Sequence, residues 1–170
     1  GQVDAAEADF SEAARRAPGD STLAGRKAEA YARVGRYEQA VRLLDALVAA
    51  RPAEGARNRL LSARCGAIGR WGRELDRGLV DCDAVIARDP AASNYGSRGI
   101  VRLRRGRLDD AIADFDAALK AAPAGSEALY GRALARLRKG QPVEAQKDFE
   151  AATAADPGVA KVFAGYGLRP

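Results

Sequence analysis

Few residues of this chain have side chains suited to catalysis or metal binding. The sequence contains no histidine, and its only cysteines are Cys65 and Cys82. Without histidine the chain lacks the most common general base and the most common metal ligand. Two cysteines alone are too few for a structural zinc site. No glycine-rich loop follows a strand pattern, so the sequence contains no phosphate-binding loop for a nucleotide. The sequence therefore predicts no enzyme, no metal site and no cofactor.

The charged residues are numerous and both signs are interspersed. Acidic residues such as Asp109, Asp110, Asp114 and Asp116 stand near arginines, and we interpret them as exposed helix pairs rather than as an acid–base pair. The net charge of +5 and the isoelectric point near 9.5 favour acidic partners mildly. The interspersed acids, and the lack of an aromatic row for base stacking, disfavour nucleic-acid binding, and a weakly nucleic-acid-binding basic protein is one alternative function.

The helices that would position any binding residues follow a repeat. Five prolines stand at intervals of 34, 38, 33 and 34 residues: Pro18, Pro52, Pro90, Pro123 and Pro157. Small residues recur at one place in this period, namely Ala28, Gly66, Gly99 and Ala133. Apolar residues recur at another, namely Phe10, Leu44, Cys82, Phe115 and Phe149. A period near 34 residues is typical of stacked helix–turn–helix units.

These columns resemble the tetratricopeptide repeat family over nearly the whole chain, and residues 98–123 are close to a consensus repeat. The resemblance implies an all-α fold, a right-handed α-solenoid of helix–turn–helix repeats with a short C-terminal capping helix. No span is long and apolar enough to cross a membrane. We expect one domain over residues 1–170, divided into a half repeat (1–18), four full repeats (19–52, 53–90, 91–123 and 124–157) and the cap (158–170).

The half repeat begins on its second helix, so we expect an upstream segment or a second copy of the chain to cover its exposed face. This makes self-association through the N-terminal half repeat an alternative function. The chain contains no methionine, and we therefore expect its first residue to follow a processing site.

The repeat at 53–90 is longer than the others, and its register decides how the cysteines lie. If the extra residues fall near 53–56, Cys65 and Cys82 face each other from two antiparallel helices, and a disulfide is possible. If they fall near 69–72, the cysteines are too far apart. We prefer the first register because it keeps Gly66 on the small-residue column, but two buried thiols remain the alternative to a disulfide. The segment LDRGLVDCDAVI is also similar to exported bacterial proteins of this family, which implies a periplasmic or exported location, with a cytoplasmic one as the alternative.

In this family the first helix of each repeat lines a concave groove, and the family's groove positions can be carried over to this chain. The expected partner-binding residues are Arg26, Arg33, Arg64, Arg70, Trp71, Ile100, Leu103, Arg104, Tyr130, Leu134, Leu137 and Arg138. Arginine pairs bidentately with carboxylates, so the resemblance implies a non-catalytic interaction module that binds an acidic or apolar peptide segment.

Two features leave alternatives open within this groove. Arg102 and Arg136 stand where the family usually has Tyr or Leu, so Leu103 and Leu137 face either the groove or the core. Trp71 either binds a partner or covers the turn between two helices. We expect Arg104 and Arg138 to be exposed.

Overall fold

The computed structural model describes residues 21–170, with side chains from residue 24 onward. The half repeat predicted over residues 1–18, and the self-association assigned to it, lie outside this range. The described residues form nine α-helices: α2 (Ser21–Arg33), α3 (Tyr37–Ala49), α4 (Glu54–Trp71), α5 (Leu75–Ile86), α6 (Ala92–Arg104), α7 (Leu108–Ala121), α8 (Ser126–Arg138), α9 (Pro142–Ala155) and α10 (Val159–Gly165).

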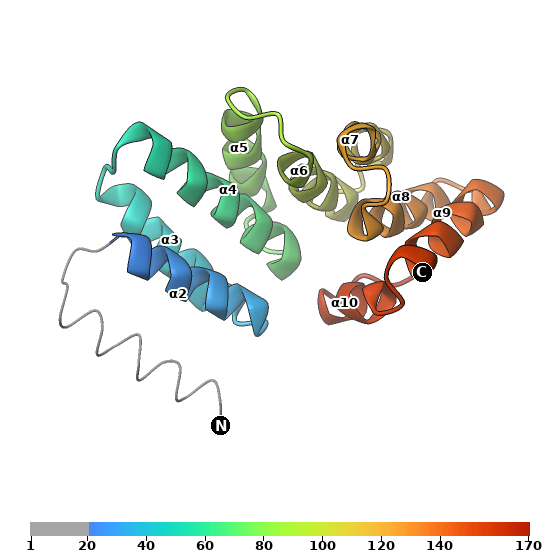
Figure 1. The fold of residues 1–170 in the computed structure, drawn as a ribbon, viewed down its shortest axis with the longest axis horizontal. Coiled ribbons are helices and arrows are strands. Elements are labelled where there is room, and N and C mark those ends of the chain that lie inside the picture. The colour runs from blue at the N-terminus through green and yellow to red at the C-terminus, as the bar shows by residue number, and fades with distance from the viewer. Residues whose placement is uncertain (1–20) are drawn as a thin grey trace.

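Consecutive helices pack as antiparallel pairs, and the pairs stack into an arc (Figure 1). The first helices of neighbouring pairs also contact one another, α2 with α4, α4 with α6 and α6 with α8. The prediction of an all-α solenoid is therefore confirmed. Helix α10 follows the last pair and packs on α8 and α9.

The small-residue column explains how closely the helices approach. Ala28, Gly66, Gly99 and Ala133 are all buried. A Cβ atom added at Gly99 would lie 2.7 Å from the ring of Phe115, and one added at Gly131 would lie 2.5 Å from the same ring. The fully buried Phe115 therefore fits between α6 and α8 only because both helices carry glycine there.

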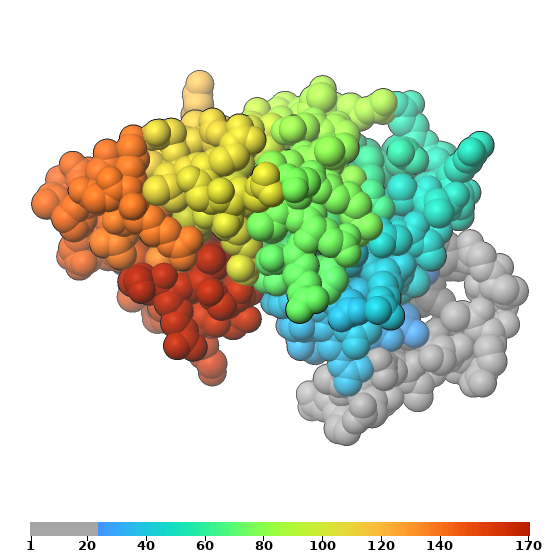
Figure 2. All heavy atoms as spheres, turned by 180° about the vertical axis from the view of Figure 1, so that it is seen from behind, coloured from blue at the N-terminus to red at the C-terminus, as the bar shows by residue number. Residues whose placement is uncertain are grey.

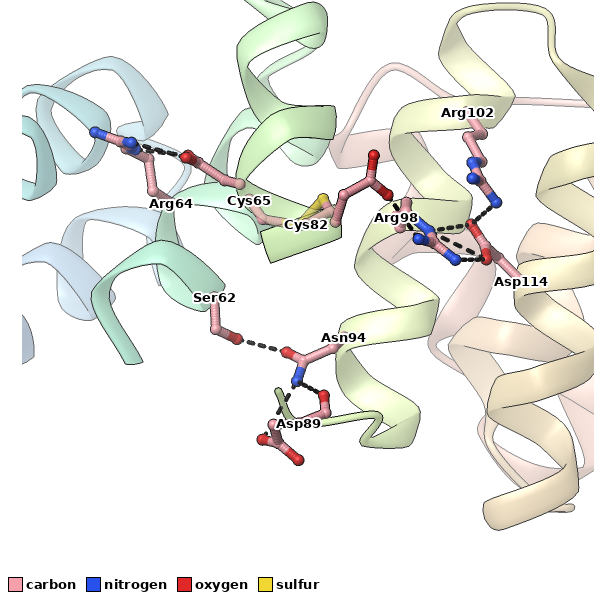
Figure 3. Close-up of a disulfide and its surroundings, with 11 residues drawn as sticks. Ser62, Arg64, Cys65, Cys82, Asp89, Asn94, Arg98, Arg102 and Asp114 are labelled. Atoms are coloured by element: carbon pink, nitrogen blue, oxygen red, sulfur yellow. Dashed lines mark hydrogen bonds and ion pairs between the residues drawn. A yellow bond between two sulfur atoms is a disulfide. The ribbon is translucent and has the colours of Figure 1, made fainter. Parts of the chain in front are cut away.

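The long repeat takes up its extra residues within a helix. Helix α4 has 18 residues, whereas α2, α6 and α8 have 13 each. Gly72 ends α4 in the left-handed conformation, with φ +78°, which glycine adopts at little cost. Cys65 on α4 and Cys82 on α5 are joined by a disulfide, with 5.4 Å between their Cα atoms (Figure 3).

Candidate partner-binding groove

Apart from Arg57 and Arg59 on α4, the arginines of the first helices fall into two groups, and the first group links the helices together. Arg98 on α6 donates to both carboxylate oxygens of Asp114 on α7, at 3.0 and 2.7 Å, and at 2.6 Å to Asp83 of the preceding pair. Arg102, one turn later, donates at 2.7 Å to the same Asp114 (Figure 3). Arg98 thus joins its own pair of helices to the pair before it.

The same arrangement recurs in the neighbouring pairs. Arg132 bridges Asp148 and Asp116, and Arg136 adds a bond to Asp148. In the long repeat Arg64 bridges Asp81 and Asp45. We call this set the arginine ladder; its members are Arg64, Arg98, Arg102, Arg132 and Arg136 with Asp45, Asp81, Asp83, Asp114, Asp116 and Asp148.

The ladder corrects two sequence-based interpretations. Asp114 is not on an exposed face, because only 2% of its surface is accessible. Arg64 does not point into the groove, because its guanidinium is held between α3 and α5 by the two aspartates it bridges. The ladder also gives Arg102 and Arg136 a role, since both bind buried carboxylates at the position where the family usually has Tyr or Leu.

Several predicted groove residues belong to the core instead. Leu103 and Leu134 are 1% and 0% exposed, so neither can contact a partner in this conformation. Ile100 is also largely buried but lines a cavity between α6 and α8. Tyr130 is largely buried, and its ring centroid lies 4.8 Å from that of Phe163 on α10. Leu137 remains partly exposed.

Trp71 lies at the end of α4 and packs against the buried cluster formed by Ala40, Val41, Ala67 and Ile68. The guanidinium of Arg73 lies over its ring, 5.7 Å from the centroid. Trp71 is thus partly buried at the turn between α4 and α5.

The second group consists of the other arginines predicted to line the groove, of which Arg26, Arg33 and Arg70 line cavities along the first helices. Its members are Arg26, Arg33, Arg70, Arg104 and Arg138, and we call them the groove arginines. Within residues 24–170, none of the five forms an ion pair with a carboxylate. Arg26, Arg33 and Arg138 are exposed to solvent.

Arg104 is not exposed as predicted. It donates to the main-chain oxygens of Gly69 and Arg70, at 2.6 and 3.0 Å, and to that of Tyr166 beyond α10. Its burial lowers the pKa of its guanidinium, and the nearby positive charge of Arg138 lowers it further. Arg104 therefore connects α6 to the end of α4 and to the C-terminal segment.

Three cavities follow the first helices along the inner side of the arc. One of about 250 Å³ lies between α2 and α4 beside Arg26, and one of about 740 Å³ lies between α2, α4 and α10. A third of about 280 Å³ lies between α6 and α8. Glu29 lines the first two and Arg70 lines the last two, so neighbouring cavities share a lining residue, and we call the three together the candidate groove.

Sequence reasoning missed the part of this groove that α10 supplies. Lys161, Val162 and Tyr166 line the largest cavity, although the C-terminal segment was expected only to cap the solenoid. The ring of Tyr166 lies 6.4 Å from that of Tyr37, and no local pattern relates two residues so far apart in the sequence.

Comparisons with known proteins agree with this architecture. Two tetratricopeptide repeat models match residues 97–160 and 1–65. A MamA structure from Desulfovibrio magneticus RS-1 is 19% identical, with a TM-score of 0.73, and the match covers 93% of this chain and 88% of that one. A thermophilic TPR protein of Thermus thermophilus is 23% identical with a TM-score of 0.73, covering 97% and 89% of the two chains. No curated protein matches the chain.

These likenesses to solved structures show the fold. Repeats of this family generally mediate protein–protein interactions and are typically non-catalytic. Over residues 21–170, no helix is long and apolar enough to cross a membrane. With repeat models matching at both ends and a solenoid of paired helices between them, the chain belongs to the tetratricopeptide repeat family.

Proposed function

We propose that this chain is a non-catalytic scaffold that binds an acidic segment of a partner protein along its inner groove. The observation that supports the proposal is the contrast between the two groups of arginines. Every ladder arginine is paired with aspartate, whereas the groove arginines have no carboxylate partner in the described part of the chain. An acidic ligand would supply carboxylates to the exposed members Arg26, Arg33 and Arg138.

The shape of the groove supports an extended or helical segment as the ligand. The three cavities run in succession from α2 to α8, so a partner chain could follow them with one side chain in each. Solenoids commonly use such concave surfaces to bind other chains.

The disulfide supports a location outside the reducing cytoplasm. Disulfides persist in oxidising compartments and are rare in the cytoplasm, so we propose that the chain and its partner act in an exported or periplasmic setting. The residues that carry this proposal are Cys65 and Cys82.

The test uses a short fluorescein-labelled peptide rich in Asp and Glu with one central leucine. We expect the double variant Arg33→Glu/Arg138→Glu to weaken binding by more than about tenfold, because two exposed groove cations become anions. The matched control is Arg42→Glu/Arg107→Glu, which changes the net charge equally at arginines that pair with Glu38 and Asp110 near them in the chain. Equal losses in both variants would mean that the peptide responds to net charge alone, and the groove would be the wrong site.

A further inference from the structure

We infer that α10 is a wall of the binding site, and that the cavity between α2, α4 and α10 accepts an apolar side chain of the partner with acidic residues on either side of it. This inference rests on the proposed function and specifies the ligand at its largest cavity. It gives the C-terminal helix a second role in addition to capping the solenoid.

Helix α10 and the residue that follows it contact both ends of the arc. On one side Phe163 is fully buried and its ring lies near that of Tyr130. On the other side Tyr166 meets Tyr37, and the guanidinium of Arg70 lies 5.8 Å from its ring centroid. From behind, the red C-terminal segment lies beside the green and blue segments of the first two pairs (Figure 2). Helix α10 itself packs on α8 and α9, Tyr166 reaches the first pairs, and together they line a cavity with α2 and α4.

The cavity between α2, α4 and α10 has apolar side chains that are exposed to solvent. Val34 and Val162 are 50% and 37% exposed, which is unusual for large apolar side chains in the described chain, and both line this cavity. Covering such side chains with a partner's apolar group is favourable because it removes hydrocarbon from water. The volume of about 740 Å³ is in the range of pockets that bind ligands.

The charges around the cavity determine the chemistry of the occupant. Arg33, Arg70 and Lys161 line it, and the acidic residue among its lining side chains is Glu29. Three cations against one anion favour a ligand with carboxylates beside the apolar side chain. We therefore commit to an acidic protein segment with a leucine-like or phenylalanine-like anchor.

The test compares two peptides on two protein variants. The probes are the acidic leucine peptide described above and the same peptide with alanine in place of leucine. Val162→Asp places a carboxylate inside the cavity, and Val80→Asp is the matched control because Val80 is 69% exposed on α5 and does not line the cavity. Circular dichroism spectra and melting curves establish that both variants remain folded.

We expect the leucine peptide to bind the wild-type chain about tenfold more tightly than the alanine peptide, because more apolar surface is buried. This ratio should fall to about one in Val162→Asp and stay unchanged in Val80→Asp, because only the first places a charge where the leucine is seated. As a second measurement, Lys161→Glu should weaken both peptides, whereas Lys147→Glu on α9 should not.

The two kinds of failure are distinguishable. If the leucine-to-alanine ratio is unchanged in Val162→Asp while Arg33→Glu/Arg138→Glu still weakens binding by more than about tenfold, α10 is only a cap and this inference is wrong, but the proposed function stands. If neither peptide binds the wild-type chain, the proposed function fails and the inference fails with it.

Discussion

The arginine ladder leads to a quantitative prediction at two aspartates of the same helix. Asp114 and Asp116 lie two residues apart on α7, and each accepts hydrogen bonds from ladder arginines. Their surroundings differ, because the side chain of Asp114 is 3% exposed and that of Asp116 is 51% exposed. Replacing each with alanine therefore removes chemically similar ion pairs from a buried and from an exposed position.

The expected losses of stability differ severalfold. Asp114→Ala leaves Arg98 and Arg102 without their shared carboxylate, and their side chains are only 15% and 17% exposed. Breaking a buried pair in this way costs about 3–5 kcal/mol of unfolding free energy. Asp116→Ala removes an exposed carboxylate, and pairs of that kind contribute about 0.2–1 kcal/mol. For a chain of this size, the gap corresponds to roughly 10 °C in melting temperature.

Urea and thermal unfolding followed by far-ultraviolet circular dichroism measure both variants. Asp148→Ala repeats the experiment at the equivalent position of the next pair, where Arg132 and Arg136 would lose their carboxylate. If Asp114→Ala and Asp116→Ala were equally stable, the buried ladder would contribute no more than a surface pair, and the reasoning from burial would be refuted.

Three further outcomes follow from the packing. Gly96→Ala should stabilise the chain by about 0.5–1 kcal/mol in urea unfolding, because the added Cβ meets nothing within 4 Å. Gly99→Ala on the same helix should destabilise the chain, because its Cβ would lie 2.7 Å from the ring of Phe115. If both variants changed the unfolding free energy in the same direction, the close contact at Gly99 would be contradicted. Thiol titration of the unfolded chain, purified without reductant, should find no free thiol from Cys65 and Cys82, whereas reduction should cost about 2–4 kcal/mol. Burial raises the pKa of Tyr166, so its contribution to stability is complete below about pH 10 and is lost as pH rises through the folded-state pKa. Tyr166→Phe should make unfolding free energy less sensitive to alkaline pH, and an unchanged profile would count against this role.

The repeat period was sufficient to predict the solenoid. The proline intervals and the small-residue column specify which residues must lie where two helices touch, and that contact is local to each repeat. The buried positions of Gly66 and Gly99 follow from it. The docking of α10 could not be predicted in this way. It depends on how far the arc curves before Tyr166 meets Tyr37, and that curvature accumulates over all the pairs.

The roles of the arginines were harder to predict, because residue type alone does not distinguish an arginine that pairs with aspartate from one that does not. Spacing to aspartate indicates the role of two of them. Arg98 and Arg132 each stand 16 residues before the aspartate that they bind, Asp114 and Asp148, and this distance carries a side chain from the first helix of a pair to the facing turn of the second. Arg33 has no aspartate 16 residues later in the sequence. Arg102 and Arg136 bind aspartates that stand 12 residues later, but Arg33 and Arg104 have Asp45 and Asp116 at the same spacing, and these aspartates pair with Arg64 and Arg132 instead. Which arginine binds an aspartate therefore depends on the face of the helix from which its side chain projects, and spacing alone does not predict it.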